Sequence, residues 1–537
     1  MLTKQEKEIF REELFRHLDG IAVAPIAYAL FKNGITTHLL QYKKTSISDL
    51  SIAFKANKGY LNVALRVISS QGWLTYSIKE NDIFIALNEH SEIAFSHFYL
   101  YKDVVSLLEY SGKFHRRKFE EKPFLKLKAL FEQYEQKFDI TDTTDKQTLS
   151  IQHQIIKHIE GILIGPTTVH LGMGGMFHKY FMEASFSADE YHSAPEHFDV
   201  ILSFLSQLGW FKRQNRKYTF TPKGLFFAKR ATAYGVTVSY IPMFRQTEEL
   251  LFGNPSILWN TASQTEESHV DREMNVWGSG GAHAAYFKKI DEIIISLFNK
   301  PIEEQPKGIL DMGCGNGAFL IHLFEVIESK TLRGKMLDDY PLFLVGADYN
   351  KTALKVTRAN LIQADIWAKV IWGDISDPKA LAKDLKEEYN ISLKDLLSVR
   401  TFLDHNRIWN PPMPATKLNT PSSSTGAFAY RGALLPNNEV EKNLKEHFNK
   451  WRPYIAQYGL IVIELHTIPP KIASKNIGKT VATAYDATHG FSDQYILEID
   501  SFLKVINEIG LRSDEKHFHR FPDSEIATVS IHYILGA

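Results

Sequence analysis

Apolar and polar positions in the first half of the chain alternate with the period of amphipathic helices. Apolar side chains recur on one helical face at Leu61, Ala64, Leu65, Val67 and Ile68, which predicts a helix. Gly72-Trp73 follows, and a glycine directly after a helix favours the left-handed C′ position. The next segment, TYSIKENDIFIAL, predicts a short hairpin with a polar turn. Helices followed by a two-stranded wing are typical of a winged helix.

This pattern occurs twice. HLDGIAVAPIAYALFKNGI from His17 aligns without a gap with HIEGILIGPTTVHLGMGGM from His158, and Gly72-Trp73 has its counterpart in Gly209-Trp210. We therefore predict two tandem, mostly α winged-helix-like units, residues 1–120 and 151–255, joined by a connecting helix over 121–150. We expect the copies to pack together as an intrachain pseudo-dimer within a monomer, with a homodimer as the alternative.

The second half contains a strand, a glycine-rich turn and a helix. In KGILDMGCGNGAFLIHLFEVI from Lys307, the turn spans Asp311 to Gly317 and the helix begins at Ala318. Gly313, Gly315 and Gly317 let the backbone approach a ligand, because none has a Cβ. The helix N-terminus offers N–H groups to a carboxylate. The G-x-G-x-G spacing differs from the dinucleotide-binding fingerprint.

Two further strands end in carboxylates. PLFLVGADYN ends at Asp348, where a carboxylate can accept both hydroxyls of a ribose, and AKVIWGDISD places Asp374 after the following strand, with Ile375 beside it. Asp374 is positioned to accept from an adenine amino group while Ile375 contacts the ring. Three such signals in order predict an α/β, Rossmann-like domain over residues 301–537 that binds an adenosine.

Residues 307–400 resemble the first motifs of class I S-adenosylmethionine methyltransferases. The resemblance implies that Asp311, Gly313, Gly315, Asn316 and Gly317 surround the methionine part of this cofactor. It places Asp348 and Tyr349 at the ribose, and Asp374 and Ile375 at the adenine.

Upstream of the glycine-rich turn, REMNVWGSGGAHAAYFKKI has a glycine run just before a predicted helix. We expect residues 256–300 to form lid or linker helices, with Arg272, Asn275 and Gly280 contacting the cofactor. Arg272 would pair with the cofactor carboxylate. A simple linker is the alternative.

Polar residues cluster after later strands, where substrates bind in this fold. The clusters contain Arg400, Asp404, His405, Arg407, Glu464, His466, Asp486, His489, Asp493 and Gln494. Two mechanisms remain open. In one, His405 or His489 is the general base for methylation of oxygen, with Arg400 also in the catalytic site. In the other, Asp404, His466 and Gln494 bind one divalent metal, Mn or Fe, which stabilises an enolate for methylation at carbon.

A second resemblance rests on NVWGSGGAHAAYF, the glycine loop, VRTFLDHNR, a histidine after strand five and HGFSDQY. This combination is similar to methyltransferase domains of polyketide synthases of the apratoxin-starter type, over roughly residues 150–535. The family implies a mononuclear metal and a malonyl unit on an acyl carrier protein. The chain differs in lacking a carrier serine motif and in a proline- and serine-rich insert, residues 410–438, which we expect to be mobile.

Composition narrows the picture further. With 537 residues the chain exceeds one core, and 62 basic against 62 acidic side chains leave no net charge. The single cysteine, Cys314, excludes an intrachain disulfide. We expect a cytoplasmic protein with no membrane contact, for which nucleic acid is an unlikely partner. The expected function is methyl transfer to a small-molecule or carrier-bound acyl substrate, with metal-assisted C-methylation placed first and O-methylation with a His general base as the alternative. A winged-helix transcriptional regulator that senses S-adenosylmethionine is the alternative of another class.

Overall fold

The computed structural model describes residues 2–536 except 80–81, 111–113, 116–117, 142 and 260–267. The chain divides into two compact units. The first contains Met1–Gly281, Ala429–Leu434 and Pro469–Ser492, and the second contains Ala282–Phe428, Leu435–Ile468 and Asp493–Ala537. Two short segments from the second half of the sequence therefore fold with the first unit.

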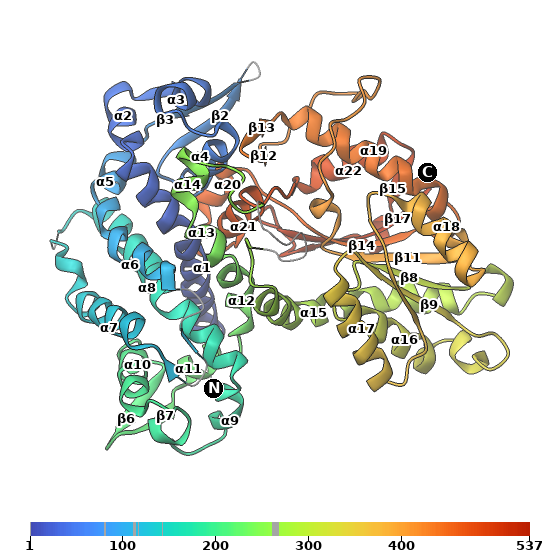
Figure 1. Ribbon diagram of the computed structural model, residues 1–537, viewed down its shortest axis with the longest axis horizontal. Helices are drawn as coiled ribbons and strands as arrows, with labels where there is room; N and C mark the ends of the chain where they lie inside the picture. The colour runs from blue at the N-terminus through green and yellow to red at the C-terminus, as the bar shows by residue number, and fades with distance from the viewer. Residues whose placement is uncertain are drawn as a thin grey trace. The chain divides into compact units, whose positions relative to one another are not determined.

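The first unit is mostly helical (Figure 1). Its helices are α1 (Lys4–Lys32), α2 (Ile35–Tyr42), α3 (Ile47–Phe54), α4 (Lys58–Ser70), α5 (Ser91–Ser96), α6 (Tyr101–Leu107), α7 (Glu121–Glu135), α8 (Lys146–Met173), α9 (Met176–Tyr180), α10 (Pro195–Gln207), α11 (Pro222–Ala228), α12 (Thr232–Ser239), α13 (Ile241–Phe244), α14 (Thr247–Phe252), α20 (Pro470–Lys475) and α21 (Ala482–Gly490). Helix α15 (Arg272–Phe298) begins in the first unit and ends in the second. Short strands complete it: β1 (Lys44–Ser46), β2 (Thr75–Lys79), β3 (Asp82–Ala86), β4 (Phe114–His115), β5 (Lys118–Phe119), β6 (Phe211–Gln214), β7 (Lys217–Phe220), and most of the hairpin β12 (Phe428–Tyr430) and β13 (Ala433–Leu435).

The predicted helix-and-wing pattern is confirmed in both copies. Helices α4 and α10 are each followed by a glycine in the left-handed region, Gly72 at φ 79° and Gly209 at φ 81°. The antiparallel hairpins β2–β3 and β6–β7 come next. The repeat therefore reflects a shared local structure, because the glycine conformation that ends each helix also starts each wing.

The two copies pack against each other through α1 and α8. A Cβ on Gly20 would lie 2.2 Å from the Cα of His158, and a Cβ on Gly161 would lie 2.3 Å from the backbone oxygen of His17. The contact is reciprocal, since each glycine meets the backbone of the histidine three positions before its counterpart. The close crossing shows the pseudo-dimeric packing within one chain.

Helix α1 is also the one candidate membrane span among the described residues. It is long and apolar enough by composition, but 78% of its apolar window is buried inside the protein. The apolar residues of α1 form core contacts with α8 and neighbouring helices.

The second unit is an α/β fold around an eight-stranded mixed sheet (Figure 1). The order is β10-β9-β8-β11-β14-β17-β15, with β16 paired to β17; β10 through β14 are parallel and β17 is antiparallel. The strands are β8 (Gly308–Met312), β9 (Phe343–Asp348), β10 (Lys369–Trp372), β11 (Leu396–Thr401), β14 (Leu460–Leu465), β15 (Leu511–Ser513), β16 (His519–Phe521) and β17 (Val529–Gly536). Its further helices are α16 (Ala318–Lys330), α17 (Lys351–Gln363), α18 (Pro378–Tyr389), α19 (Asn437–Ile455) and α22 (Ile499–Asn507). The predicted Rossmann-like fold is confirmed.

Two segments differ in detail from the sequence expectation. The glycine run expected just before a helix lies inside α15, where Gly278 packs against Gly235: a Cβ on Gly278 would lie 2.7 Å from the Cα of Gly235. The small residues serve a close helix contact there. The insert 410–438, expected to be mobile, is hydrogen-bonded, for example from Ser424 Oγ to Glu498 Oε2 at 2.6 Å and from Ser422 Oγ to Glu441 Oε1 at 2.6 Å.

Candidate active site

The glycine loop follows β8, at the point where the strand order reverses between β8 and β11. Hydrogen bonds with β9 and α17 fix its backbone. The N–H of Gly313 donates to the Ala347 carbonyl at 2.7 Å, and Thr357 Oγ1 donates to the Gly315 carbonyl at 2.8 Å. Asn360 Nδ2 donates to the Asn316 carbonyl at 2.8 Å. Strand β9 and helix α17 therefore fix the loop, which lies at the switch point where α/β sheets bind ligands.

The three loop glycines have different roles, although all three have positive φ. A Cβ on Gly313 would lie 2.8 Å from the Leu403 side chain, and one on Gly317 would lie 3.1 Å from Thr357. A Cβ on Gly315 would meet only the carbonyl oxygen of Gly313, at 4.0 Å. Gly313 and Gly317 thus accommodate the protein's own packing, and Gly315 borders open space that a ligand can fill.

Asp311 has a buried carboxyl group at the end of β8. Neither of its oxygens has a hydrogen-bond partner among the described residues, and its exposed fraction is 1%. Burial, with a smaller contribution from the negative charge of Asp348, raises the pKa of Asp311 to about 8. An unpaired buried carboxyl is costly, and a cationic ligand in the loop would compensate it. The ammonium and sulfonium groups of S-adenosylmethionine fit this requirement.

The other predicted cofactor residues in this unit lie at the same edge. Asp348 Oδ2 accepts from the Gly315 N–H at 3.0 Å, which joins the ends of β8 and β9. Tyr349 is exposed, so its side chain borders solvent. Asp374 accepts from the Ser376 N–H at 2.7 Å and is followed by the buried Ile375. The parallel strands bring these residues to one edge, as their sequence positions predicted.

His405 and Glu464 form a buried pair beyond β11 and β14. His405 Nδ1 lies 2.6 Å from Glu464 Oε1, and the His405 N–H donates to Glu464 Oε2 at 3.2 Å. A carboxylate only accepts, so Nδ1 carries the proton and Nε2 keeps a lone pair when the ring is neutral. The pair is thus an imidazole base held by a carboxylate.

Arg400 and Asp404 are both buried, each with an exposed fraction of 1%. Arg400 Nε lies 3.0 Å from Asp404 Oδ2, and His447 Nε2 lies 2.8 Å from Asp404 Oδ1. Burial is the largest influence on the pKa of His447, which it lowers to about 4. His447 is therefore neutral near pH 7 and donates to Asp404 through Nε2–H.

His466, just after β14, belongs to a buried chain of hydrogen bonds. Its Nδ1 lies 2.9 Å from the Leu497 carbonyl and its Nε2 lies 2.6 Å from Ser530 Oγ, which lies 2.6 Å from His532 Nε2. Because a carbonyl only accepts, Nδ1 of His466 is the donor. Burial lowers the pKa of His466 to about 4.

A small cavity of about 200 Å³, counting space that opens to solvent, joins these groups. It is lined by Asp404, His405, Arg407, Leu444, Glu464, Leu465, His466, Tyr495, Leu497 and Phe502. The polar residues after β11 and those at the end of β14 thus meet around one space, at the edge of the sheet where the sequence predicted them. Gln494 is buried in the same unit.

Asp486 and His489 belong to α21, in the first unit. Asp486 Oδ2 lies 3.1 Å from Arg66 Nε in α4, and His489 Nδ1 lies 2.8 Å from the Tyr485 carbonyl. Arg272, Asn275 and Gly280 also lie in this unit, on α15, where Asn275 Nδ2 donates to Ser239 Oγ at 3.2 Å. Their roles at the cofactor stay predictions.

The only group of three His, Cys, Asp or Glu ligand atoms close enough for a metal, among the described residues, lies elsewhere: Glu13, His17 and Glu160. Lys157 Nζ lies 2.7 Å from Glu160 and Lys223 Nζ lies 2.8 Å from Glu13. These lysines already neutralise the carboxylates, so the group is a buried ion-pair network.

Sequence reasoning did not single out three residues that the structure brings to the site: His447, Trp451 and Ser530. The first two lie four residues apart on α19, which the sequence shows only as an amphipathic helix. Ser530 lies in β17, whose antiparallel return beside β14 is a long-range pairing. Local sequence patterns contain no signal for the position of these three residues at the site.

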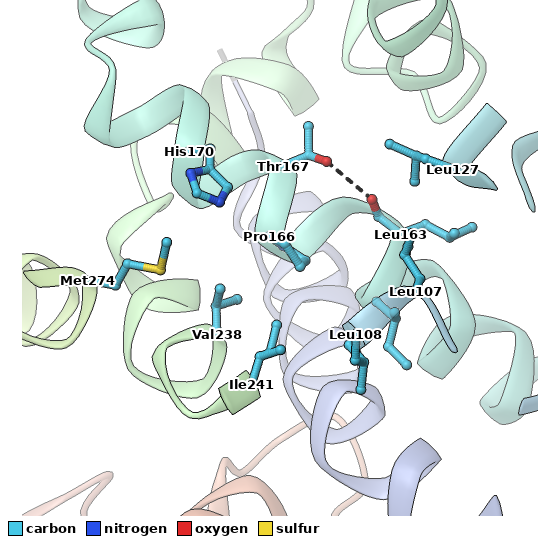
Figure 2. Close-up of a pocket in the computed structure, with 11 residues that line it drawn as sticks. Leu107, Leu108, Leu127, Leu163, Pro166, Thr167, His170, Val238, Ile241 and Met274 are labelled. Atoms are coloured by element: carbon cyan, nitrogen blue, oxygen red, sulfur yellow. Dashed lines mark hydrogen bonds between the residues drawn. The ribbon is translucent and has the colours of Figure 1, made fainter. Parts of the chain in front are cut away.

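A second cavity, of about 450 Å³ including space open to solvent, lies in the first unit around Pro166 of α8 (Figure 2). Leu107, Leu108, Leu127, Val238, Ile241 and Met274 surround it, with Thr167 and His170 as polar neighbours. The proline interrupts the hydrogen bonding of α8, and the cavity lies beside this interruption.

Comparisons with protein families identify three consecutive parts of the chain. Residues 267–532 match the AprA MT2-like domain, residues 160–254 the AprA winged helix domain, and residues 10–76 the AprA N-terminal domain. A comparison with curated protein sequences finds no match.

Solved structures with some similarity include the mitomycin 7-O-methyltransferase MmcR, with 12% identity, a TM-score of 0.38, and coverage of 72% of this chain and 100% of that one. The O-methyltransferase NcsB1 of neocarzinostatin biosynthesis, solved with S-adenosylmethionine, has 14% identity, a TM-score of 0.38, and coverage of 69% and 96%. The CMeT domain of the citrinin polyketide synthase has 10% identity, a TM-score of 0.34, and coverage of 78% and 98%.

Proposed function

Because the chain belongs to the AprA MT2-like methyltransferase family, we propose that it methylates a small-molecule or carrier-bound acyl substrate with His405 as general base. The observation that carries the proposal is the 2.6 Å contact between His405 Nδ1 and Glu464 Oε1 beside the cavity. S-adenosylmethionine, when bound, supplies an electrophilic methyl group. Asp311, Gly313, Gly315, Asn316 and Gly317 would hold its methionine part, Asp348 and Tyr349 the ribose, and Asp374 and Ile375 the adenine.

The chain's residues must then align a nucleophile and take up its proton. Nδ1–H of His405 is directed to Glu464. Nε2 is therefore the atom that accepts the proton, either from an oxygen nucleophile or from a carbon made acidic by a neighbouring carbonyl. Glu464 holds the ring and stabilises the imidazolium that forms. The same pair therefore serves O-methylation and methylation at a carbon beside a carbonyl.

A general-base role for His405 agrees better with the hydrogen bonds of Asp404 and His466 than the metal hypothesis does. Asp404 directs its oxygens to Arg400 and His447, and both ring nitrogens of His466 contact protein acceptors or hydroxyls. A metal held by Asp404, His466 and Gln494 would have to displace these partners. We therefore place the base mechanism ahead of the metal-assisted one.

The regulator alternative is disfavoured by α4, the helix that directly precedes the β2–β3 wing of the first winged unit. Every residue from Gly59 to Ser70 is buried, whereas a recognition helix must present a face to the major groove. A DNA-binding role for this unit would require α4 to be uncovered.

The test is substitution of His405 by Ala, with methyl transfer from labelled S-adenosylmethionine to acyl thioesters and phenolic compounds as the readout. We expect kcat to fall by about 10²- to 10⁴-fold, the usual contribution of a general base, while calorimetry shows unchanged cofactor binding. Full activity of His405→Ala would refute the base assignment.

His489→Ala is the matched control, because it removes the other histidine that the sequence offered as a base. Glu464→Gln keeps a hydrogen-bond acceptor for Nδ1–H but removes the charge, and we expect an intermediate loss. Equal losses in His405→Ala and His489→Ala would contradict the preference for His405.

A further inference from the structure

Helix α19 donates hydrogen bonds to two separate loops at the edge of the sheet. His447 and Trp451 lie four residues apart, and therefore on one face of the helix. Both are buried. Trp451 Nε1 donates to the Ile375 carbonyl at 2.8 Å, and His447 Nε2 donates to Asp404 Oδ1 at 2.8 Å. One rigid face thus supports both the loop after β10 and the turn after β11.

Arg400 lies between these two contacts. Its guanidinium carbon is 4.7 Å from the centre of the Trp451 ring, and its Nε is 3.0 Å from Asp404 Oδ2. A planar guanidinium can stack on an aromatic ring while it pairs with a carboxylate. Arg400 therefore contacts both Trp451, which donates to Ile375, and Asp404, which accepts from His447.

Asp404 directly precedes His405, so its position fixes the turn that presents the base. The same turn is held by Arg407, whose Nη1 donates to the Asp404 carbonyl at 2.9 Å and whose Nε donates to Asn443 Oδ1 at 2.6 Å. Asn443 is also on α19. The helix consequently determines where His405 stands relative to Glu464.

We propose that Arg400, His447 and Trp451 are positioning residues that couple the cofactor loop at Ile375 to the turn that carries His405. The inference rests on the proposed function in that Ile375 faces the adenine and His405 is the base. Movement of either loop shifts the face of α19 on which the other depends. Cofactor binding then orders the turn that carries His405, and the position of this turn, set through Asp404, affects the affinity for the cofactor.

Two substitutions each remove one contact and leave the other. Trp451→Phe keeps a ring beneath Arg400 and loses the donor to Ile375. His447→Leu loses the donor to Asp404, and His447→Gln retains one. A single buried hydrogen bond corresponds to about a three- to tenfold change in an equilibrium constant.

The crossed readouts test the coupling. We expect His447→Leu to weaken S-adenosylmethionine binding at least about threefold in calorimetry, and Trp451→Phe to lower kcat at saturating cofactor by about the same factor. His447→Gln should restore most of the loss. Arg400→Lys, which cannot stack and pair in the same way, should impair both properties.

Lys442→Gln, on α19 but outside these contacts, is the control and should change neither property. The coupling is overturned if His447→Leu changes only kcat and Trp451→Phe changes only cofactor affinity. Near-ultraviolet circular dichroism shows whether each variant is folded; an unfolded Arg400→Lys leaves the other two variants as the test. Loss of the proposed function is distinguishable, because the effect of His447→Leu on cofactor affinity does not depend on His405 being the base.

Discussion

Gly20 of α1 lies directly on the backbone of His158 of α8, at a point where a Cβ would be only 2.2 Å from the His158 Cα. Backbone cannot move aside as a flexible side chain can. The Gly20→Ala variant should therefore push the two helices apart and destabilise the first unit by about 3 kcal/mol, the upper end of the usual cost of overpacking. Thermal unfolding followed by circular dichroism measures the effect.

Gly175→Ala is the control for this prediction. Gly175 has φ 77° and nothing near its Cβ position, so alanine there adds backbone strain without a clash. That strain costs about 1–2 kcal/mol. Equal destabilisation by Gly20→Ala and Gly175→Ala would show that the helix crossing relaxes easily.

Gly315→Ala should abolish cofactor binding without unfolding the second unit. The glycine has φ 56° and borders open space, so a methyl group would occupy volume that we assign to the ligand. Gly175→Ala introduces comparable backbone strain away from this loop and should leave affinity unchanged. Calorimetry with S-adenosylmethionine compares the two, and unchanged affinity of Gly315→Ala would remove the loop from the binding site.

Cofactor binding should release a proton near neutral pH. The pKa of Asp311 is raised to about 8 by burial and by Asp348, so the free protein holds a proton there at pH 7. A cationic ligand favours the carboxylate. Affinity should therefore rise up to about tenfold per pH unit below pH 8 and level off above it.

Calorimetry in two buffers of different ionisation enthalpy measures the released proton directly. Asp311→Asn should bind more weakly and without this pH dependence, because the amide does not titrate. A wild-type affinity that is constant between pH 6 and 8 would contradict the assignment of Asp311 to the cofactor.

The first unit should lose stability as the pH rises from 4 to 7. Burial raises the pKa of Asp19 from 3.8 to about 7, so the unfolded chain releases this proton first as the pH rises. In that window the folded state binds more protons than the unfolded state, and stability falls by up to about 1.4 kcal/mol per pH unit. Above pH 7 this contribution is constant.

Asp19→Asn keeps an acceptor for Gln71 Nε2, which lies 3.2 Å from Asp19 Oδ2, but cannot ionise. Its melting temperature should exceed that of the wild type at pH 8 and approach it at pH 4. Asp103→Asn, at an exposed position of α6, is the surface control. A constant difference between Asp19→Asn and the wild type across this range would contradict the prediction.

Chelation should leave catalysis intact if His405 is the base. Dialysis against a strong chelator, followed by assay with and without added Mn or Fe, separates the two mechanisms. We expect unchanged turnover in the metal-free enzyme. Loss of activity with recovery on adding Mn or Fe would favour the metal held by Asp404, His466 and Gln494.

The repeat, the helix ends and the glycine loop follow from local features of the amino-acid sequence. Gly72 and Gly209 end their helices in the left-handed region. Asp311 and Asp348 lie at the ends of β8 and β9, and Asp374 follows β10. These features are local: each depends on backbone conformation within a few residues, and parallel strands bring their ends to one edge whatever the rest of the fold does.

Which polar residues meet depends on long-range packing, which the local sequence does not specify. Glu464 became the partner of His405 because β11 and β14 are adjacent, and His447 and Trp451 reached the site through one face of α19. Long-range packing also divided the polar residues after strand five between two units, with Asp486 paired to Arg66 in the first. Contacts between distant segments depend on how whole elements pack, and hydrophobic periodicity specifies which face of an element is buried but not its neighbour.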